Sequence, residues 1–305
     1  MKKRAFERAL EILPGACVWT TFVLSIALSF LRPIWMVYFI ILFDFYWLLR
    51  ILYFTPFLFL SWVRYRRALR VDWQALAEQT HGYDRIRHVI FLPTYKEELA
   101  VVETTLHALA ACSYPASRMM VVLAGEERDV ERFRHIAEHV HAWAEQMFGV
   151  FCVTIHPRDL PDEIPGKGSN LHWSALQIVP KVFAMEWDPD DVIVSSFDVD
   201  AIVHPQYFSC LTRTYLTIPE PTRSSYQPVA LYNNNLWESP AAVRVAMFGT
   251  TFWLMTELAR PEGMMTFSSH STSLRMLMDV GYWHKNVVSE DSRIFLQGLI
   301  RYHGS

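Results

Sequence analysis

The sequence is poor in the features that mark several common classes of protein. Its cysteines form no C-x-x-C pair and no regular spacing, so neither a structural zinc site nor a disulfide framework is indicated. The formal net charge is only −3, and no overall positive field favours nucleic acid as a partner. The G-x-x-x-x-G-K-[ST] motif of a P-loop is also missing. Apolar residues, by contrast, make up 52% of the chain, and their excess lies near the N-terminus.

Two apolar stretches near the N-terminus are long enough to cross a lipid bilayer. Residues 15–31 carry no charge, and after Arg32–Pro33 a second apolar stretch runs to about residue 63. We expect two membrane spans, over 15–31 and 34–54. A bend near Thr55–Pro56 and an interfacial segment to about residue 63 would follow. A cleavable signal peptide is the alternative for the first stretch, and the second stretch, which follows at once, argues against it.

Basic residues flank this predicted hairpin at both ends. They are Lys2, Lys3, Arg4 and Arg8 before the first span, and Arg64, Arg66, Arg67 and Arg70 after the second. The positive-inside rule therefore predicts that both ends lie in the cytoplasm, at an inner (plasma) membrane. We divide the chain into a membrane hairpin (1–70), a helical connector (71–87) and a cytosolic domain (88–305).

In the cytosolic domain, short apolar runs typical of buried strands alternate with helical patterns. The strands are expected over 88–92, 119–124, 150–155, 192–194 and 226–232. The helices are expected over 97–112, 126–148, 205–218 and 241–259, with a strand and helix within 264–283 and a last helix from about residue 293. This alternation predicts an α/β fold with a mostly parallel sheet flanked by helices.

Two acids follow the strand expected at 192–194. Asp198 and Asp200 are one residue apart, and two ionised carboxylates at the end of a buried strand need a partner. A hard divalent cation shared with a phosphorylated ligand would provide one. When the pair is considered alone, the spacing favours a turn with two solvated acids.

A glycine-flanked lysine lies in the segment 157–170. Gly166 and Gly168 allow close approach of the backbone to a ligand, and Lys167 supplies a positive charge for phosphate. Ser169 and Asn170 can cap the following helix, whose N-terminus favours anions. A plain glycine-rich turn remains the alternative.

Four separated pieces of the chain together resemble the family 2 glycosyltransferases. The pieces are Pro93-Thr94-Tyr95-Lys96-Glu97, Gly166-Lys167-Gly168-Ser169-Asn170, Asp198-Val199-Asp200 and Glu290-Asp291. Their order and rough spacing over about 88–300, behind a membrane hairpin, are similar to the polysaccharide-synthase-like branch that includes cellulose and hyaluronan synthases. The resemblance implies a nucleotide-diphospho-sugar transferase fold of the glycosyltransferase-A type.

The resemblance also implies a role for each matching residue. Thr94, Tyr95 and Glu97 would contact the base and ribose of a nucleotide-sugar. Lys167, with Ser169 and Asn170 beside it, would lie at the phosphates. Asp198 and Asp200 would hold the donor through Mg²⁺ or Mn²⁺, with Asp200 as the direct ligand. Asp291 would be the general base that deprotonates the acceptor hydroxyl, and Glu290 its orienting neighbour.

The implied activity is inverting transfer of a sugar, from a UDP-sugar by preference, to a polysaccharide or glycolipid acceptor at the membrane. Transfer to a polyprenyl phosphate is one alternative, and a catalytically silent, nucleotide-binding membrane component is another. A nucleotidyltransferase is disfavoured, because no glycine-rich, arginine-containing signature follows the first strand.

Two departures from the family pattern stand out. The family usually has a base-reading acid after the second strand, where this chain has Ala124-Gly125-Glu126-Glu127-Arg128. Glu126 is the candidate substitute, which leaves the identity of the base open. The Gln-x-x-Arg-Trp motif of processive synthases is missing as well. Either the chain is C-terminally truncated or the enzyme is not processive. We expect truncation, with further transmembrane helices or a partner subunit in the complete form.

Overall fold

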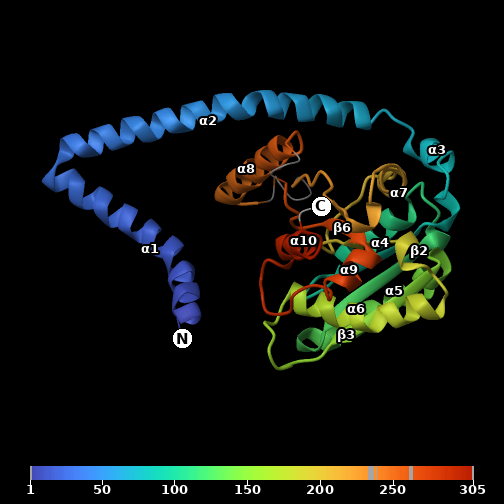
Figure 1. Cartoon of the computed structure of the whole chain (residues 1–305). Helices are drawn as coiled ribbons and strands as arrows, with labels where there is room; N and C mark the ends of the chain where they lie inside the picture. Colours follow the sequence, from blue (N-terminus) through green and yellow to red (C-terminus); the bar gives the residue numbers. More distant parts are fainter. Residues whose placement is uncertain (1, 233–236, 238, 261–263, 304–305) are drawn as a thin grey trace.

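The computed structural model describes residues 2–232, 237, 239–260 and 264–303. Two long N-terminal helices extend to one side of an α/β unit (Figure 1). The strands of that unit are β1 (Arg87–Pro93), β2 (Met119–Glu126), β3 (Val150–His156), β4 (Val192–Ser196), β5 (Ser225–Tyr226) and β6 (His270–Ser273).

These strands form one sheet in the order β3-β2-β1-β4-β6-β5. The four strands from β3 to β4 are parallel, and β6 runs antiparallel to both of its neighbours. The predicted α/β architecture with a mostly parallel sheet is thus confirmed.

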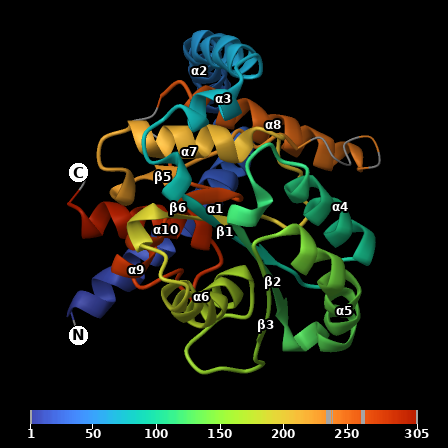
Figure 2. The same cartoon turned by 90° about the vertical axis from the view of Figure 1, so that its right-hand side faces the viewer.

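Helices cover both faces of the sheet. The helices that follow the N-terminal pair are α3 (Trp73–Glu78), α4 (Leu99–Ala110), α5 (Val130–Met147), α6 (Lys167–Ala184), α7 (Tyr207–Thr217), α8 (Ala241–Glu257), α9 (Leu274–Asp279) and α10 (Glu290–Arg301), of which α3 packs on α7 and α8 on α2. Helices α4 and α5 lie on one face, and α6, α9 and α10 lie on the other (Figure 2).

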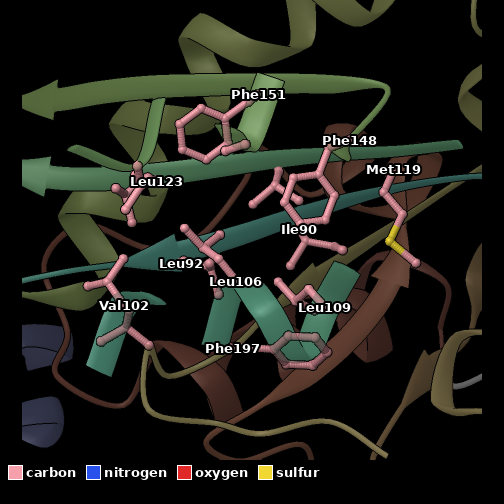
Figure 3. Close-up of a cluster of buried hydrophobic side chains, with 14 of the residues drawn as sticks. Ile90, Leu92, Val102, Leu106, Leu109, Met119, Leu123, Phe148, Phe151 and Phe197 are labelled. Atoms are coloured by element: carbon pink, nitrogen blue, oxygen red, sulfur yellow. The ribbon is translucent and has the colours of Figure 1, made fainter. Parts of the chain in front are cut away.

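Alternating side chains of β1 divide the hydrophobic core between these two faces. Ile90 and Leu92 pack with α4 and α5 in the cluster of Figure 3, whereas Val89 and Phe91 pack towards α6 and α9. Both sets are buried, which explains why β1 reads as a continuous apolar run rather than an alternating one.

The order in which the chain adds strands to the sheet changes side between β1 and β4, although the two strands are parallel. From β1 the chain continues outward to β2 and β3, then returns to add β4 on the other side of β1. In open parallel α/β sheets, ligands bind outside the carboxyl ends of the strands at such a switch point. The topology thus directs attention to the loops that follow β1 and β4.

The two N-terminal helices are α1 (Lys2–Leu31) and α2 (Pro33–Ala68). Residues 8–31 and 33–68 are long and apolar enough to cross a bilayer. The most apolar part of each helix is not buried against the rest of the protein. The core helices of soluble proteins are, in contrast, mostly buried. A signal sequence near the N-terminus can have the same length and apolar composition as these helices. Helix α2 continues through Thr55–Pro56, where we expected a bend. The loss of one N–H at Pro56 does not end the helix, and the Thr55 hydroxyl donates to the carbonyl of Ile51.

Three other element predictions need correction. The strand expected over 226–232 is reduced to β5, because Pro228 offers no N–H and the Gln227 side chain bonds the loop around Phe267 instead. The connector 71–87 contains α3 and a short 3₁₀ turn at Tyr83–Arg85 rather than one helix. The last helix begins at Glu290, not at about residue 293, which places both predicted acids in its first turn.

Candidate active site

The predicted site residues other than Glu126 of β2 come from four segments that meet at the carboxyl end of the sheet. Thr94–Glu97 follow β1, and Asp198–Asp200 follow β4, so the two loops lie on either side of the switch point. Lys167 opens α6, and Asp291 lies in the first turn of α10.

Lys167 is the positive centre of this group. Its Nζ lies 2.6 Å from Asp198 Oδ1 and 3.8 Å from Glu290 Oε1. It also donates to the carbonyl of Ser268 at 3.4 Å. The structure therefore joins three of the predicted residues, Lys167, Asp198 and Glu290, in one charged cluster.

Ser268, which the sequence analysis did not select, connects this cluster to Asp291. Its hydroxyl donates to Asp198 Oδ2 at 2.6 Å, and its backbone N–H donates to Asp291 Oδ2. Its φ of 52° lies in the left-handed region, which costs a non-glycine residue of order 1 kcal/mol. Such strain persists where surrounding contacts impose it, and here the hydrogen bonds to two acids do so.

The imidazole ring of His270 contacts the backbone of Ser268. Trp283 Nε1 donates to His270 Nε2 at 3.3 Å, so the ring proton lies on Nδ1, 3.2 Å from the carbonyl of Ser268. Burial, with the positive charge of Lys167, lowers the pKa of His270 to about 4. The neutral ring thus fixes the loop without adding charge to the site.

The charge state of Asp198 follows from its neighbours. Burial alone would raise its pKa, but the ammonium of Lys167 and hydrogen bonds from Lys167 and Ser268 outweigh this and hold the pKa below its usual value. Asp198 is accordingly a stable anion whose two carboxylate oxygens are both hydrogen-bonded within the protein.

Asp291 is held by the start of α10. Its Oδ1 accepts from the N–H of Ser292 at 2.7 Å, and its carbonyl accepts from the Thr266 hydroxyl at 2.6 Å. An acid in the first turn is favoured by the helix dipole. With the Ser268 contact, these bonds fix the predicted base relative to Asp198.

Glu290 is buried directly against the start of α6. Its side chain is 5% exposed, and burial raises its pKa while the Lys167 ammonium opposes the rise. A Cβ on Gly168 would lie 2.7 Å from the carbonyl oxygen of His284 and 3.0 Å from Glu290 Cβ. Gly168 is therefore needed for close packing of α6 on Glu290.

We expect Gly168→Ala to lower the free energy of unfolding by about 1–3 kcal/mol, because the clash is with backbone that cannot move aside. Gly166→Ala is the matched control. Its Cβ would meet nothing within 4 Å, and its φ of 162° is extended backbone open to any residue. Urea denaturation of both variants tests this, and equal stabilities would contradict the assigned role of Gly168.

Glu97 and Asp200 form a second acidic group on the outer side of the site. Asp200 is exposed and Glu97 half-buried. Burial, and then the negative charge of Asp200, raise the pKa of Glu97. The two carboxylates therefore lie close enough to repel each other, an arrangement that a cation would relieve.

This acidic pair fits a divalent cation that is shared with a ligand. Among the described residues, no three His, Cys, Asp or Glu side chains are placed to hold a metal ion on their own. Mg²⁺, however, is commonly bound by one or two carboxylates together with phosphate oxygens and water. Asp200 and Glu97 can supply that carboxylate part, whereas both oxygens of Asp198 bond Lys167 and Ser268.

Tyr95 and Glu126 are brought together by a residue that was not predicted, Arg128. Its guanidinium lies 4.5 Å from the centroid of the Tyr95 ring and pairs with the buried carboxylate of Glu126, with Nε at 2.7 Å from Oε2. Glu126 is the last residue of β2, where the family would have its base-reading acid. Here Arg128 occupies one of its oxygens and presents a cation and an aromatic ring at this edge.

The remaining predicted residues are engaged in the fold. Thr94, Ser169 and Asn170 are all buried. Thr94 Oγ1 donates to the carbonyl of Leu92, and Ser169 Oγ to that of Gly166. Asn170 Nδ2 donates to the carbonyl of Ala124 and so ties α6 to the end of β2. Their contact with a donor remains a prediction.

A hollow of about 540 Å³ lies apart from this group, between the region of β5 and helices α9 and α10. Its lining includes Arg223, Arg275, Arg301, Asp190 and Asp279, and none of the predicted site residues. Arg275 pairs with Asp190 at 2.6 Å, and Tyr302 donates to Asp279. We therefore place the site at the switch point, where the acids and Lys167 converge.

Searches of protein-family models and of curated proteins find no match to the chain. Among solved structures, it is similar to the mannosyltransferase PcManGT from Pyrobaculum calidifontis in complex with GDP-Man and Mn²⁺. The identity is 16% over 79% of this chain and 59% of that one, with a TM-score of 0.42. It is also similar to S. aureus TarS, with 11% identity over 71% of this chain and 34% of that one and a TM-score of 0.35. The chain thus spans less than two thirds of either structure. Such low sequence identities and TM-scores do not identify the reaction, so we infer it from the residues of the site.

Proposed function

We propose that the chain is a membrane-anchored, metal-dependent, inverting glycosyltransferase of the family 2, synthase-like type. It would transfer a hexose from a nucleotide-sugar, UDP-linked by preference, to a hydroxyl of a polysaccharide or glycolipid. The observation that carries this proposal is the convergence of Lys167, Asp198 and Asp291 at the switch point between β1 and β4. This is where an α/β sheet binds nucleotides, and the charges suit a phosphorylated donor.

The donor would lie along the carboxyl edge of β2, β1 and β4. The base and ribose would face Tyr95, Arg128 and Glu126, where the exposed Tyr95 ring lies against the half-buried Arg128 guanidinium. The phosphates face Lys167 and the acidic pair Glu97 and Asp200. A bound Mg²⁺ or Mn²⁺ would neutralise the charge that develops on the leaving diphosphate.

The reaction needs one base and one direct attack. Asp291 takes the proton of the acceptor hydroxyl, and the acceptor oxygen forms a bond to the anomeric carbon. The bond from that carbon to the diphosphate oxygen breaks, and its electron pair leaves with the nucleoside diphosphate. Lys167 stabilises the developing negative charge more strongly in the transition state than in the ground state. A single displacement inverts the anomeric configuration.

The membrane anchor would be α1 and α2, whose exposed apolar lengths suit two crossings. The basic residues at both ends of this hairpin favour a cytoplasmic position for the α/β unit. Lipid, a lipid-linked or polysaccharide acceptor and further membrane helices or a partner subunit are the partners implied.

The proposal is tested by assaying detergent-solubilised protein with a panel of UDP- and GDP-sugars, in Mg²⁺ or Mn²⁺ and in EDTA. We expect turnover of one donor, abolished by EDTA and by Asp200→Ala. Glu145→Ala is the control and should leave turnover unchanged. Glu145 is an exposed acid near the end of α5 and is not one of the predicted site residues. Metal-dependent nucleotide binding without transfer to any acceptor would favour the silent component, and absence of nucleotide binding would contradict the assignment of the site.

A further inference from the structure

Helix α8 has an unusual surface for a helix attached to an α/β unit. Residues 241–250, which form its first ten positions, have the sequence AAVRVAMFGT and are exposed or half-exposed throughout. Val245 is 73% exposed and Phe248 65% exposed, and Arg244 is the only charged residue in this half. A helix that is apolar and exposed around most of its circumference is not suited to water.

The other end of α8 joins this surface to α2. Leu254, Met255 and Thr256 are buried, and α8 lies beside α2 in both overall views (Figures 1 and 2). Just beyond the helix, the Arg260 guanidinium lies 5.4 Å from the ring of Tyr53 and 5.7 Å from that of Phe54. The exposed apolar surface of α2 therefore continues onto α8.

The charges next to this surface favour a lipid bilayer as its occupant. Exposed arginines follow the apolar part of α2, namely Arg64, Arg66, Arg67 and Arg70 at the end of that helix and just beyond it. Arg244 lies near the start of α8, and no acidic residue lies between Arg244 and Glu257. Aromatic and aliphatic side chains next to cations match the interfacial layer of a membrane with anionic headgroups.

We propose that residues 241–250 of α8 insert into the interfacial layer of the bilayer that α2 crosses, as a third membrane-contacting helix. This inference rests on the proposed anchoring by α1 and α2. It goes beyond that anchoring because α8 lies between strands β5 and β6 of the α/β unit in the sequence.

The position of α8 gives this contact a consequence for the site. Trp253 of α8 packs edge-on against Phe267, with ring centroids 5.4 Å apart, and Phe267 adjoins Ser268. A membrane-seated α8 therefore holds the membrane surface beside the loop that bonds Asp198 and Asp291. An acceptor linked to lipid can then reach Asp291 without leaving the bilayer.

The test measures membrane depth with a fluorophore on single cysteines of the full chain, in vesicles of phosphatidylcholine and phosphatidylglycerol. The exposed or half-exposed natural thiols are removed by Cys17→Ala, Cys112→Ala and Cys210→Ala. Labels are placed at Val245→Cys, at Ile41→Cys in α2 and at Glu145→Cys in α5. We expect a lipid-attached quencher to act on positions 245 and 41 several-fold more than on position 145, with the opposite order for aqueous iodide.

Different outcomes separate this inference from the anchor. Quenching by lipid at position 41 but by iodide at position 245 would overturn the inference and leave the anchor intact. Access of iodide to both positions would overturn both. Protection of position 245 from both quenchers, varying with the protein-to-lipid ratio, would assign the surface to a second copy of the chain and overturn the inference. Photo-crosslinking of the unmodified chain to a photoactivatable lipid, read at residues 241–250 against 130–147, gives the same decision without cysteine variants.

Discussion

Asp291→Asn is expected to reduce the turnover number for sugar transfer by about 10²–10⁴-fold while leaving donor affinity nearly unchanged. The amide keeps an oxygen that can accept the N–H of Ser268 or Ser292, so the start of α10 is preserved. It cannot take the proton of the acceptor hydroxyl. The measurement is steady-state kinetics with the donor identified in the panel, together with calorimetric binding of the nucleotide.

Asp159→Asn is the matched control for this change. Asp159 is exposed, and its φ of 57° is one that asparagine tolerates, so the same acid-to-amide replacement should alter neither turnover nor stability. Retention of full turnover by Asp291→Asn would remove Asp291 as the base. It would favour a polyprenyl phosphate acceptor, which is already anionic and needs no deprotonation.

Lys167→Met is expected to have the second large effect, a loss of about 10²–10³-fold in turnover with weaker donor binding. Methionine keeps much of the side-chain volume but removes the charge that faces Asp198, Glu290 and the proposed diphosphate. Lys181→Met makes the same replacement on the same helix, where the amine lies 3.7 Å from Cys152 Sγ, and should have little effect on turnover.

The Lys167 variant also has a distinct pH dependence of stability. In the unchanged protein the lowered pKa of Asp198 contributes stability that is present above the unfolded pKa of about 3.9 and is lost as the pH falls through the folded pKa. Without the ammonium, burial raises that pKa instead, and the contribution disappears. Because the Asp198 side chain is 43% exposed, solvent screens its pairing with Lys167. The difference in unfolding free energy between the two proteins should therefore be no more than about 1 kcal/mol at neutral pH and shrink in acid. Urea denaturation in EDTA at several pH values measures it, and a difference independent of pH would contradict this account.

The parts of the fold that follow from local patterns were predictable. Strands such as β1 and β2 are buried on both faces, so they leave continuous apolar runs, and helices such as α5 leave a regular apolar stripe. Because parallel strands end at the same edge, acids after β4 and the loop after β1 could be expected to meet. Lys167, Asp198, Glu290 and Asp291 do meet there.

What could not be predicted depends on contacts between distant segments. The left-handed Ser268 is defined by bonds to Asp198 and Asp291, and no local signal separates it from the other hydroxyl residues in the run 266–273. Asn170 looked like a ligand or cap residue, but its amide is used by the carbonyl of Ala124. The pairing of Arg128 with Glu126 could likewise be seen only in the structure. Two charges close in sequence do not reveal whether their side chains point to the same side of the chain.

The way in which Ser268 joins the two acids also bears on the order of events during synthesis. Lys167 and Asp198 belong to segments that leave the ribosome well before Ser268 and Asp291 do, and α1 and α2 leave before all of them. Under the proposed function, the half of the site that would face the donor can therefore assemble first, on a chain whose proposed membrane anchor has already been made. The half that would face the acceptor is completed only when β6 and α10 have been added. If the proposed function holds, sugar transfer would become possible only late in translation, after the half that would face the nucleotide has formed.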